Sequence, residues 1–252
     1  LHRGERVLEP FDPDLVSMLA DAYRHAGVTI RTRAAVSTIE RSGSALRVTC
    51  TDGTSCDCDM VVHGAGRVPD LADLDLAAAG VAVGRRGVRV DEHLRAQGNE
   101  RVFAIGDAAA MGAPLTPVAI AQARVVARGI LGDTTARFEP RATPSAVFSD
   151  PPLASVGMGE ADARASGIDI DVVLTDSSGW ASVRRTGARV SGAKVIAERE
   201  SEQVLGAHLL GPSADEVINV FALAIAQRMT RAELRSALWA YPTAGSDIVY
   251  LL

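Results

Sequence analysis

The stretch Val102-Phe103-Ala104-Ile105-Gly106-Asp107 decides the fold class, because an apolar run ends abruptly in a glycine and a carboxylate. The apolar run predicts a buried strand. Thr116-Pro117 then opens a helical pattern that ends near Gly129–Gly132. The start of such a helix offers free N–H groups and the positive end of the helix dipole. A strand, a Gly-Asp loop and a helix in this order predict an α/β ligand site.

The composition excludes several classes of protein. A length of 252 residues allows one large domain or two ordinary ones, and 47% hydrophobic residues exclude a disordered chain. The net charge of −5 leaves no basic surface for nucleic acid or an anionic membrane, and 4% aromatic residues argue against base stacking. Because the apolar runs are all too short to span a bilayer, we expect no membrane partner.

The N-terminus and the cysteines narrow the expectation further. The chain begins at Leu1 rather than Met, and no apolar signal-peptide core follows, so we expect a piece of a longer cytoplasmic polypeptide. Cys50, Cys56 and Cys58 lack the paired C-x-x-C spacing of a zinc site and are interpreted as small strand residues in a reduced compartment. The histidines show no metal-ligand spacing either, so we predict no metal.

Residues 1–66 are predicted to form α/β structure. Asp12-Pro13 is a helix start, with Asp as the N-cap, and Gly27 is its stop. Asp52-Gly53 marks a hairpin turn. The apolar runs around these signals predict four strands: Val28–Arg33, Val36–Arg41, Leu46–Cys50 and Asp59–His63.

The C-terminal half is predicted to be α+β. A helix over Gly159–Ser166, a strand over Ile170–Thr175 and a hairpin of Val190–Glu198 with Gln203–Leu210 come first. Two capping boxes follow: Ser213 with Glu216 opens a helix to Arg228, and Thr230 with Glu233 opens one to about Leu238. The first of these helices is apolar nearly all round, so it is either deeply buried or packs against another subunit.

Four motifs together carry a family resemblance. Val102–Asp107 with Leu115–Ile120 resembles the second FAD-binding motif of the pyridine nucleotide-disulfide oxidoreductases. Ala65–Asp70 resembles the return from the NAD domain, Phe148–Gly157 the start of the dimerisation domain, and His208–Glu216 the entry to its central helix. The order is similar to that of glutathione reductase, dihydrolipoamide dehydrogenase and mercuric reductase.

The resemblance implies a domain plan. Residues 1–66 would be the C-terminal part of an NAD(P)-binding Rossmann-like domain, and residues 67–138 the closing segment of an FAD-binding one. Residues 139–252 would form a complete α+β dimerisation domain that makes a homodimer.

The resemblance also implies a set of FAD-binding residues. The Asp107 carboxylate would accept hydrogen bonds from the ribityl hydroxyls, and Gly106 would let the backbone approach the flavin. Thr116, at the helix start, would face the pyrimidine edge of the ring, and Gly66 would lie near the cofactor. The alternatives are that Asp107 caps a local turn and that Gly66 is a simple turn glycine.

Arg3 and Arg6 occupy the end of the strand that selects the nicotinamide cofactor in the family. An acid there suits the ribose 2′-hydroxyl of NAD and an arginine the 2′-phosphate of NADP. Arg3 therefore favours NADP over NAD, although Glu9 stands where NADPH-specific relatives carry a second arginine. The alternative is that both arginines are solvated surface residues.

Tyr241 is the candidate catalytic residue. Family members carry His-Pro-Thr-x-x-Glu near the C-terminus, and this chain has Tyr241-Pro242-Thr243-Ala244-Gly245-Ser246. A phenol with a pKa near 10 is a poor base at neutral pH, but it can donate a proton or a hydrogen bond. Mercuric reductases also place Tyr before this Pro. The alternative is that Tyr241 only packs.

The sequence also lacks two family features. It contains neither a G-x-G-x-x-G phosphate loop after a strand nor a Cys-x4-Cys redox pair. The predicted function is an FAD-dependent NAD(P)H oxidoreductase that passes electrons to a disulfide or another small-molecule acceptor, with the chain itself expected to be inactive. The alternatives are a non-catalytic dimerisation fragment and a transhydrogenase or NADH-oxidase relative without a redox disulfide.

Overall fold

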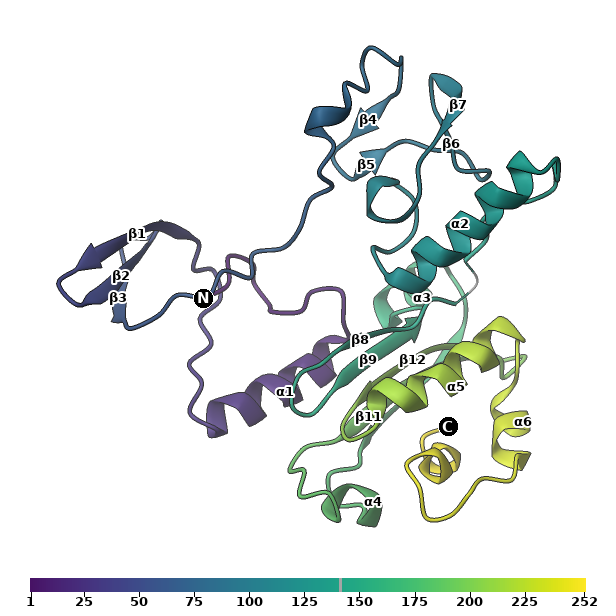
Figure 1. Ribbon diagram of the computed structural model, residues 1–252. Coiled ribbons are helices and arrows are strands. Elements are labelled where there is room, and N and C mark those ends of the chain that lie inside the picture. Colours follow the sequence, from purple (N-terminus) through teal and green to yellow (C-terminus); the bar gives the residue numbers. More distant parts are fainter. Residues whose placement is uncertain (141) are drawn as a thin grey trace. The chain divides into compact units, whose positions relative to one another are not determined.

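The computed structural model describes residues 1–140 and 142–252 (Figure 1). The chain forms two compact units. Leu1–His63 together with Pro144–Leu252 make the first, and Gly64–Thr143 make the second. Both mix helices with short sheets, which confirms the predicted α/β and α+β classes.

A five-stranded antiparallel sheet organises the first unit. Its order is β10 (Ile170–Asp176), β11 (Gly192–Glu198), β12 (Val204–Leu210), β9 (Leu153–Gly157) and β8 (Ser145–Val147). The hairpin β11–β12 pairs Lys194 with His208, so these two side chains share one face of the sheet. The predicted hairpin is therefore confirmed, with strands that begin one or two residues later than expected.

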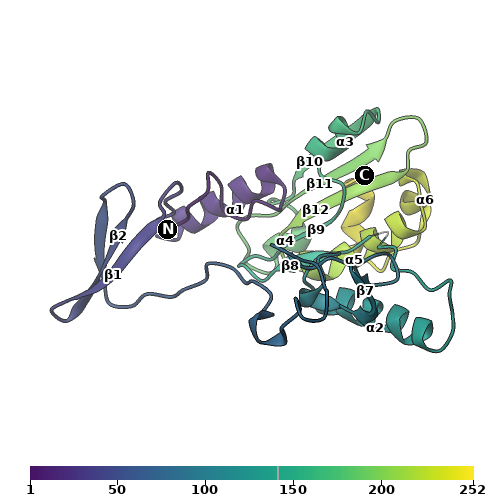
Figure 2. The ribbon, with the colours of Figure 1, turned by 90° about the horizontal axis from the view of Figure 1, so that it is seen from above.

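Helices cover both faces of this sheet (Figure 2). Helices α1 (Pro13–His25) and α3 (Glu160–Ala165) lie on one face, where Leu15 and Leu19 pack against Leu153 and Leu210. Helix α5 (Ala214–Ala226) lies on the other, with Phe221 buried. Alternating side chains explain this, because successive residues of a strand point to opposite faces. The short helices α4 (Ala181–Arg184) and α6 (Arg231–Ser236) and the 3-10 segment Gly245–Tyr250 complete the unit.

The ends of α1 follow the predicted signals. The Asp12 carboxylate accepts hydrogen bonds from the N–H groups of Asp14 (3.0 Å) and Leu15 (3.2 Å), and Pro13 opens the helix. Gly27 takes φ +91°, the left-handed conformation that a helix stop requires.

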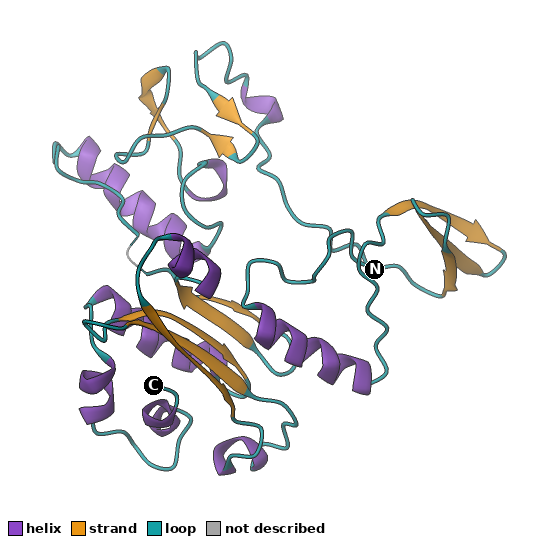
Figure 3. Cartoon of the chain, turned by 180° about the vertical axis from the view of Figure 1, so that it is seen from behind, coloured by secondary structure: helices purple, strands orange, loops and turns teal. Residues whose placement is uncertain are grey.

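A small antiparallel sheet also belongs to the first unit (Figure 3). It consists of β1 (Val36–Ser42), β2 (Ala45–Cys50) and β3 (Ser55–Cys58), and Gly53 in the β2–β3 turn has φ +82°. The predictions of strands over Val28–Arg33 and Asp59–His63 are wrong. Residues 31–34 exchange only a few backbone hydrogen bonds with residues 2–4, and residues 59–63 form none with any described residue, so neither segment has a partner for a ladder.

The capping signals of the C-terminal helices had different outcomes. The Thr230 box is confirmed: Thr230 Oγ1 accepts from the Glu233 N–H at 3.1 Å, and the Thr230 N–H donates to Glu233 Oε2 at 2.8 Å. The Ser213 box is wrong, because Ser213 takes φ +64° and its side chain makes no capping bond. Helix α5 ends at Ala226 rather than Arg228, and it buries only one face, since Leu223 is 61% exposed.

The second unit contains short β-pairs and one long helix. Strands β4 (Val83–Gly84) and β5 (Gly87–Val88) pair, as do β6 (Arg95–Ala96) and β7 (Asn99–Phe103). The 3-10 turn η1 (Ala72–Leu74) precedes these strands, and the 3-10 turn η2 (Gly106–Ala108) and helix α2 (Thr116–Ile130) follow them. Leu94 is fully buried in the core of this unit. The strand predicted over Val102–Ile105 is only partly confirmed: β7 covers Val102 and Phe103, ends there, and contains no buried residue, since Ala104, which is buried, lies just beyond it. Across the described part of the chain, the helices are too short or too polar to cross a bilayer.

Candidate functional site

The Gly106-Asp107 turn of the second unit is built on helix α2. Gly106 takes φ +59°, and its N–H donates to Gln122 Oε1 of α2 at 2.6 Å. The side-chain amide of Gln122 also donates from Nε2 to the Met111 carbonyl at 2.9 Å, and Gln122 is fully buried. A Cβ added at Gly106 would lie 3.1 Å from the Ala119 Cβ. Close packing and the left-handed backbone therefore both require glycine here.

This turn leaves polar groups available for a ligand. Asp107 is exposed, and its carboxylate makes no hydrogen bond or ion pair with any residue of the described part. Helix α2 begins without a side-chain cap, and Thr116 at its start is exposed, so the first N–H groups keep their donors for a ligand or for water. The Asp107 carboxylate lies on η2, and the uncapped N–H groups lie at the start of α2, which packs against η2. Together they can bind a ligand that has hydroxyl groups for the carboxylate and an electron-rich edge for the N–H groups. The alternative that Asp107 caps a local turn finds no supporting bond.

Gly66 belongs to the same unit but to no secondary-structure element. It is exposed, has φ +94°, and a Cβ added there would meet no atom within 4 Å. Its backbone conformation, rather than crowding, is therefore what favours glycine.

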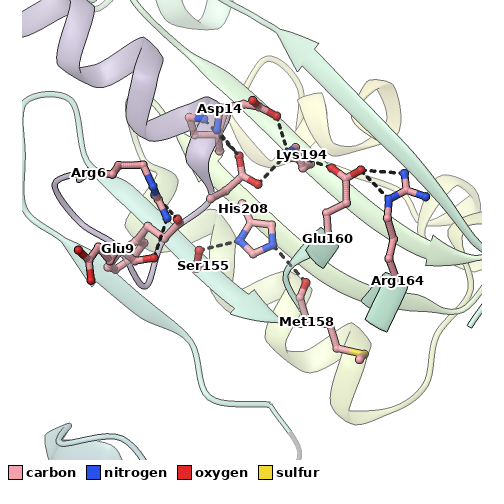
Figure 4. A network of polar contacts seen from close by, with 12 residues as sticks. Arg6, Glu9, Asp14, Ser155, Met158, Glu160, Arg164, Lys194 and His208 are labelled. Atoms are coloured by element: carbon pink, nitrogen blue, oxygen red, sulfur yellow. Dashed lines mark hydrogen bonds and ion pairs between the residues drawn. The ribbon is translucent and has the colours of Figure 1, made fainter. Parts of the chain in front are cut away.

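The arginines of the first unit differ in their surroundings. Arg3 is exposed and forms no side-chain hydrogen bond with another described residue. Arg6 donates from Nη1 to the Phe11 carbonyl and from Nη2 to the Glu9 carbonyl, both at 2.8 Å (Figure 4). Arg6 thus holds the loop before α1, and Arg3 keeps a free guanidinium. The Glu9 carboxylate lies 3.7 Å from Nε2 of His2.

Tyr241 is 84% exposed, so within this chain it does not pack. The loop behind it is held locally: the Thr243 hydroxyl donates to the Ala240 carbonyl at 2.6 Å, and the Ser246 hydroxyl donates to the Thr243 carbonyl at 2.7 Å. The Asp247 carboxylate accepts a short hydrogen bond from the Ser182 hydroxyl. Asp247 is therefore engaged by Ser182 rather than by the Tyr241 phenol.

A buried polar cluster escaped the sequence-based prediction. It joins Asp12, Lys194, Glu160 and His208 beneath α1 (Figure 4). The Ser155 hydroxyl lies 2.7 Å from Nδ1 of His208, and Nε2 of that ring lies 3.2 Å from the Met158 carbonyl. Because a carbonyl only accepts, Nε2 is the donor and the neutral ring is fully bonded. Burial lowers the pKa of His208, against the opposing effect of Asp12. The one available signal was that Lys194 is the only lysine in the sequence.

Comparison with known proteins identifies the family. The profile described as pyridine nucleotide-disulphide oxidoreductase matches residues 1–123, and that of the family's dimerisation domain matches residues 143–251. The chain belongs to the pyridine nucleotide-disulfide oxidoreductase family.

Individual relatives agree with this membership. An uncharacterized 19.7 kDa protein in a mercuric resistance operon of Staphylococcus aureus is 44% identical over 67% of this chain and 94% of its own length. Glutathione reductase of Burkholderia cepacia is 33% identical over 100% of this chain and 56% of its own length. The Cu(II) complex of an HOCl-induced flavoprotein disulfide reductase from Escherichia coli has a TM-score of 0.91 and 28% identity, covering 100% of this chain and 58% of that chain. The chain thus spans little more than half the length of these two reductases.

Proposed function

We propose that the protein acts in an FAD-dependent NAD(P)H oxidoreductase of the disulfide-reductase type, with a disulfide or another small molecule as electron acceptor. The observation that carries the proposal is the Gly106-Asp107 turn, held by buried Gln122 against a helix whose first N–H groups are uncapped. Family membership and the likeness to a flavoprotein disulfide reductase support it.

The residues of the second unit fit the flavin end of FAD. The free Asp107 carboxylate would accept hydrogen bonds from ribityl hydroxyls, and Gly106 would bring the backbone close to the cofactor. Thr116 and the first turn of α2 would stabilise negative charge on the ring through N–H groups and the helix dipole. Gly66 would line the cofactor from the preceding segment. When bound, the flavin supplies hydride acceptance and onward electron transfer.

The first unit would supply the nicotinamide side and the proton donor. Arg3, with its free guanidinium, would pair with the 2′-phosphate of NADP, while Arg6 shapes the loop. The exposed Tyr241 phenol would donate a proton or a hydrogen bond to the acceptor. We place the homodimer interface in residues 139–252.

Flavin retention tests this proposal in the native protein. Asp107→Ala should lower the flavin content, measured by visible absorbance after desalting, because the ribityl hydroxyls lose their acceptor. Asp73→Ala is the matched control, since Asp73 is an exposed acid of η1 in the same unit. Equal flavin content in both variants would remove Asp107 from the cofactor site.

A second candidate is a non-catalytic dimerisation protein. The observation that favours it is that residues 143–251 match the profile of the family's dimerisation domain. Intact mass spectrometry of the native polypeptide discriminates the two. A colourless native protein of 26.3 kDa would establish this second candidate and exclude the enzyme.

A further inference from the structure

Buried Lys194 lies at the centre of a carboxylate cluster, partly open to solvent, that the proposed function does not use. Its side chain is only 3% exposed, and Nζ lies 2.8 Å from Asp12 Oδ2, 2.5 Å from Asp14 Oδ2 and 3.2 Å from Glu160 Oε2 (Figure 4). The three carboxylates come from two different segments, the start of α1 and the start of α3. One ammonium on strand β11 therefore ties both to the sheet.

The cluster holds its charges in place. Burial alone would lower the pKa of Lys194, but the hydrogen bonds that its ammonium donates to Asp12 and Asp14 outweigh burial and raise that pKa, so the ammonium stays charged. Arg164 donates two hydrogen bonds to Glu160, at 2.7 and 3.0 Å, and so balances part of the excess negative charge. Removing Lys194 would leave the Asp12 carboxylate, which is 1% exposed, without its cationic partner.

Asp12 connects this cluster to the loop that carries Arg3. One carboxylate oxygen caps α1, and the other accepts from Lys194. The residue before it, Phe11, presents its carbonyl to Arg6, which also holds the carbonyl of Glu9. The connection from β11 to this loop thus runs through the Lys194–Asp12 ion pair, the peptide bond to Phe11 and the hydrogen bonds of Arg6 to Phe11 and Glu9.

We propose that Lys194 is a positioning residue that holds the loop of residues 3–11 against the sheet. In this way it would fix the position of Arg3 for binding the 2′-phosphate of a nicotinamide dinucleotide. The contacts of Lys194 with Asp12, Asp14 and Glu160 support the docking of the loop. The part concerning Arg3 rests on the proposed function.

Hydrogen exchange of the full 252-residue chain tests the docking. In Lys194→Met, peptides covering residues 2–16 should exchange at least about tenfold faster, because a buried carboxylate loses its partner and the segment opens locally. Peptides of β12 should keep their protection. Unchanged exchange of residues 2–16 would overturn the proposal.

Arg231→Met is the matched control. Arg231 is also buried, with a side chain 11% exposed, and it also binds two acids, Asp171 at 2.6 Å and Glu202 at 3.1 Å. Neither acid belongs to α1. This variant should lose general stability without faster exchange of residues 2–16; acceleration in both variants alike would show that the effect is not specific to Lys194.

Asp12→Asn separates docking from capping. Asparagine caps a helix about as well as aspartate, so α1 keeps its cap while the charge that faces Lys194 is lost. Exchange of the loop should accelerate as in Lys194→Met, and the double variant should add nothing further. Fully additive effects would contradict the direct contact.

Nucleotide titrations test the link to Arg3. Lys194→Met should weaken NADPH binding more than NADH binding, Arg231→Met should change neither, and Arg3→Ala should remove the difference between the two nucleotides. A uniform loss for both nucleotides would indicate a merely structural role and overturn the link. These titrations use the native protein, and no nucleotide binding by its unaltered form would refute the nucleotide part of the proposed function, whereas the exchange experiment still decides the docking.

Discussion

The Tyr241 phenol is exposed and forms no hydrogen bond with a carboxylate or histidine of the described residues. Its phenol is 84% exposed, and Asp247, the nearest acid along the loop, is bonded to Ser182 instead. Such a phenol can donate a proton but cannot accept one readily at neutral pH. We therefore expect Tyr241 to donate a proton or a hydrogen bond rather than to act as a base, as a histidine would.

We predict that Tyr241→Phe in the native protein lowers turnover with the true acceptor roughly 100-fold, a typical contribution of one general acid. Flavin reduction by NADPH should keep its rate, because that step does not need the phenol. Stopped-flow measurements separate the two rates. Tyr250→Phe is the control, since Tyr250 is also exposed but contacts Trp180 edge-on. If both variants turn over normally, Tyr241 has no part in catalysis.

His208 makes stability depend on pH. Because burial lowers its pKa in the folded state below the ordinary value of 6.5, the unfolded chain binds the proton more readily. The free energy of unfolding should therefore fall as pH drops below about 6.5. The carboxylates Glu160 and Asp171, whose pKa values are lowered by hydrogen bonds from Arg164 and Arg231, add their own loss only below about 4.5.

Urea unfolding of His208→Gln between pH 7 and 5 measures the contribution of this residue. The decline of stability over that range should shrink, because glutamine carries no proton that burial penalises. His63→Gln serves as the control, since His63 is exposed. An unaltered decline in His208→Gln would show that His208 is not the group responsible.

At the scale of single residues, the sequence pointed to exposed polar residues such as Asp107, but not to the buried polar residues that hold the neighbouring backbone in place. Gly106 and Asp107 follow an apolar run, which is a local pattern. Gln122 and Lys194 act across long sequence separations, on Gly106 and on Asp12, and no local pattern encodes such contacts. For the same reason, the hydrogen bonds of Arg6 to the carbonyls of its own loop could not be predicted from the sequence.

At the scale of elements, two capping boxes of the same pattern behave differently. Thr230 forms both reciprocal bonds with Glu233, whereas Ser213 is left-handed and forms none. The N-cap backbones themselves differ, since Ser213 has φ +64° and Thr230 is extended at φ −85°. The same four-residue signature therefore starts both helices but caps only one.

We predict that Thr230→Ala destabilises the chain by about 1 kcal/mol, the usual value of a lost N-cap. Ser213→Ala should cost less than half of that, because no capping bond is lost. Thermal or urea unfolding of the two variants compares them directly. Equal losses would mean that the two helix starts contribute alike.

Helices were predicted better than strands for a physical reason. The end signals of α1, Asp12 and Gly27, act within the helix itself. A strand needs a partner, and Val28–Arg33 finds only residues 2–4 beside it. Apolar alternation alone therefore predicted a strand that the described chain does not complete.

At the scale of the whole molecule, the outer side of α5 carries an apolar residue that its own chain leaves uncovered. Ile218 and Phe221 are buried against the sheet, but Leu223 is 61% exposed. Leu238 and Tyr241, in the segment after α6, are exposed as well. Apolar groups of this kind in a domain that matches a dimerisation profile suggest a surface for a second copy.

We predict that Leu223→Asp converts the chain from dimer to monomer, because a carboxylate cannot be buried in an apolar contact without a partner. Light scattering after size exclusion measures the mass. Leu174→Asp is the control: Leu174 is 52% exposed on β10, in register with Lys194 and therefore on the sheet face opposite α5. This control should remain a dimer. Monomers from both variants would point to general destabilisation, and dimers from both would place the contact away from α5.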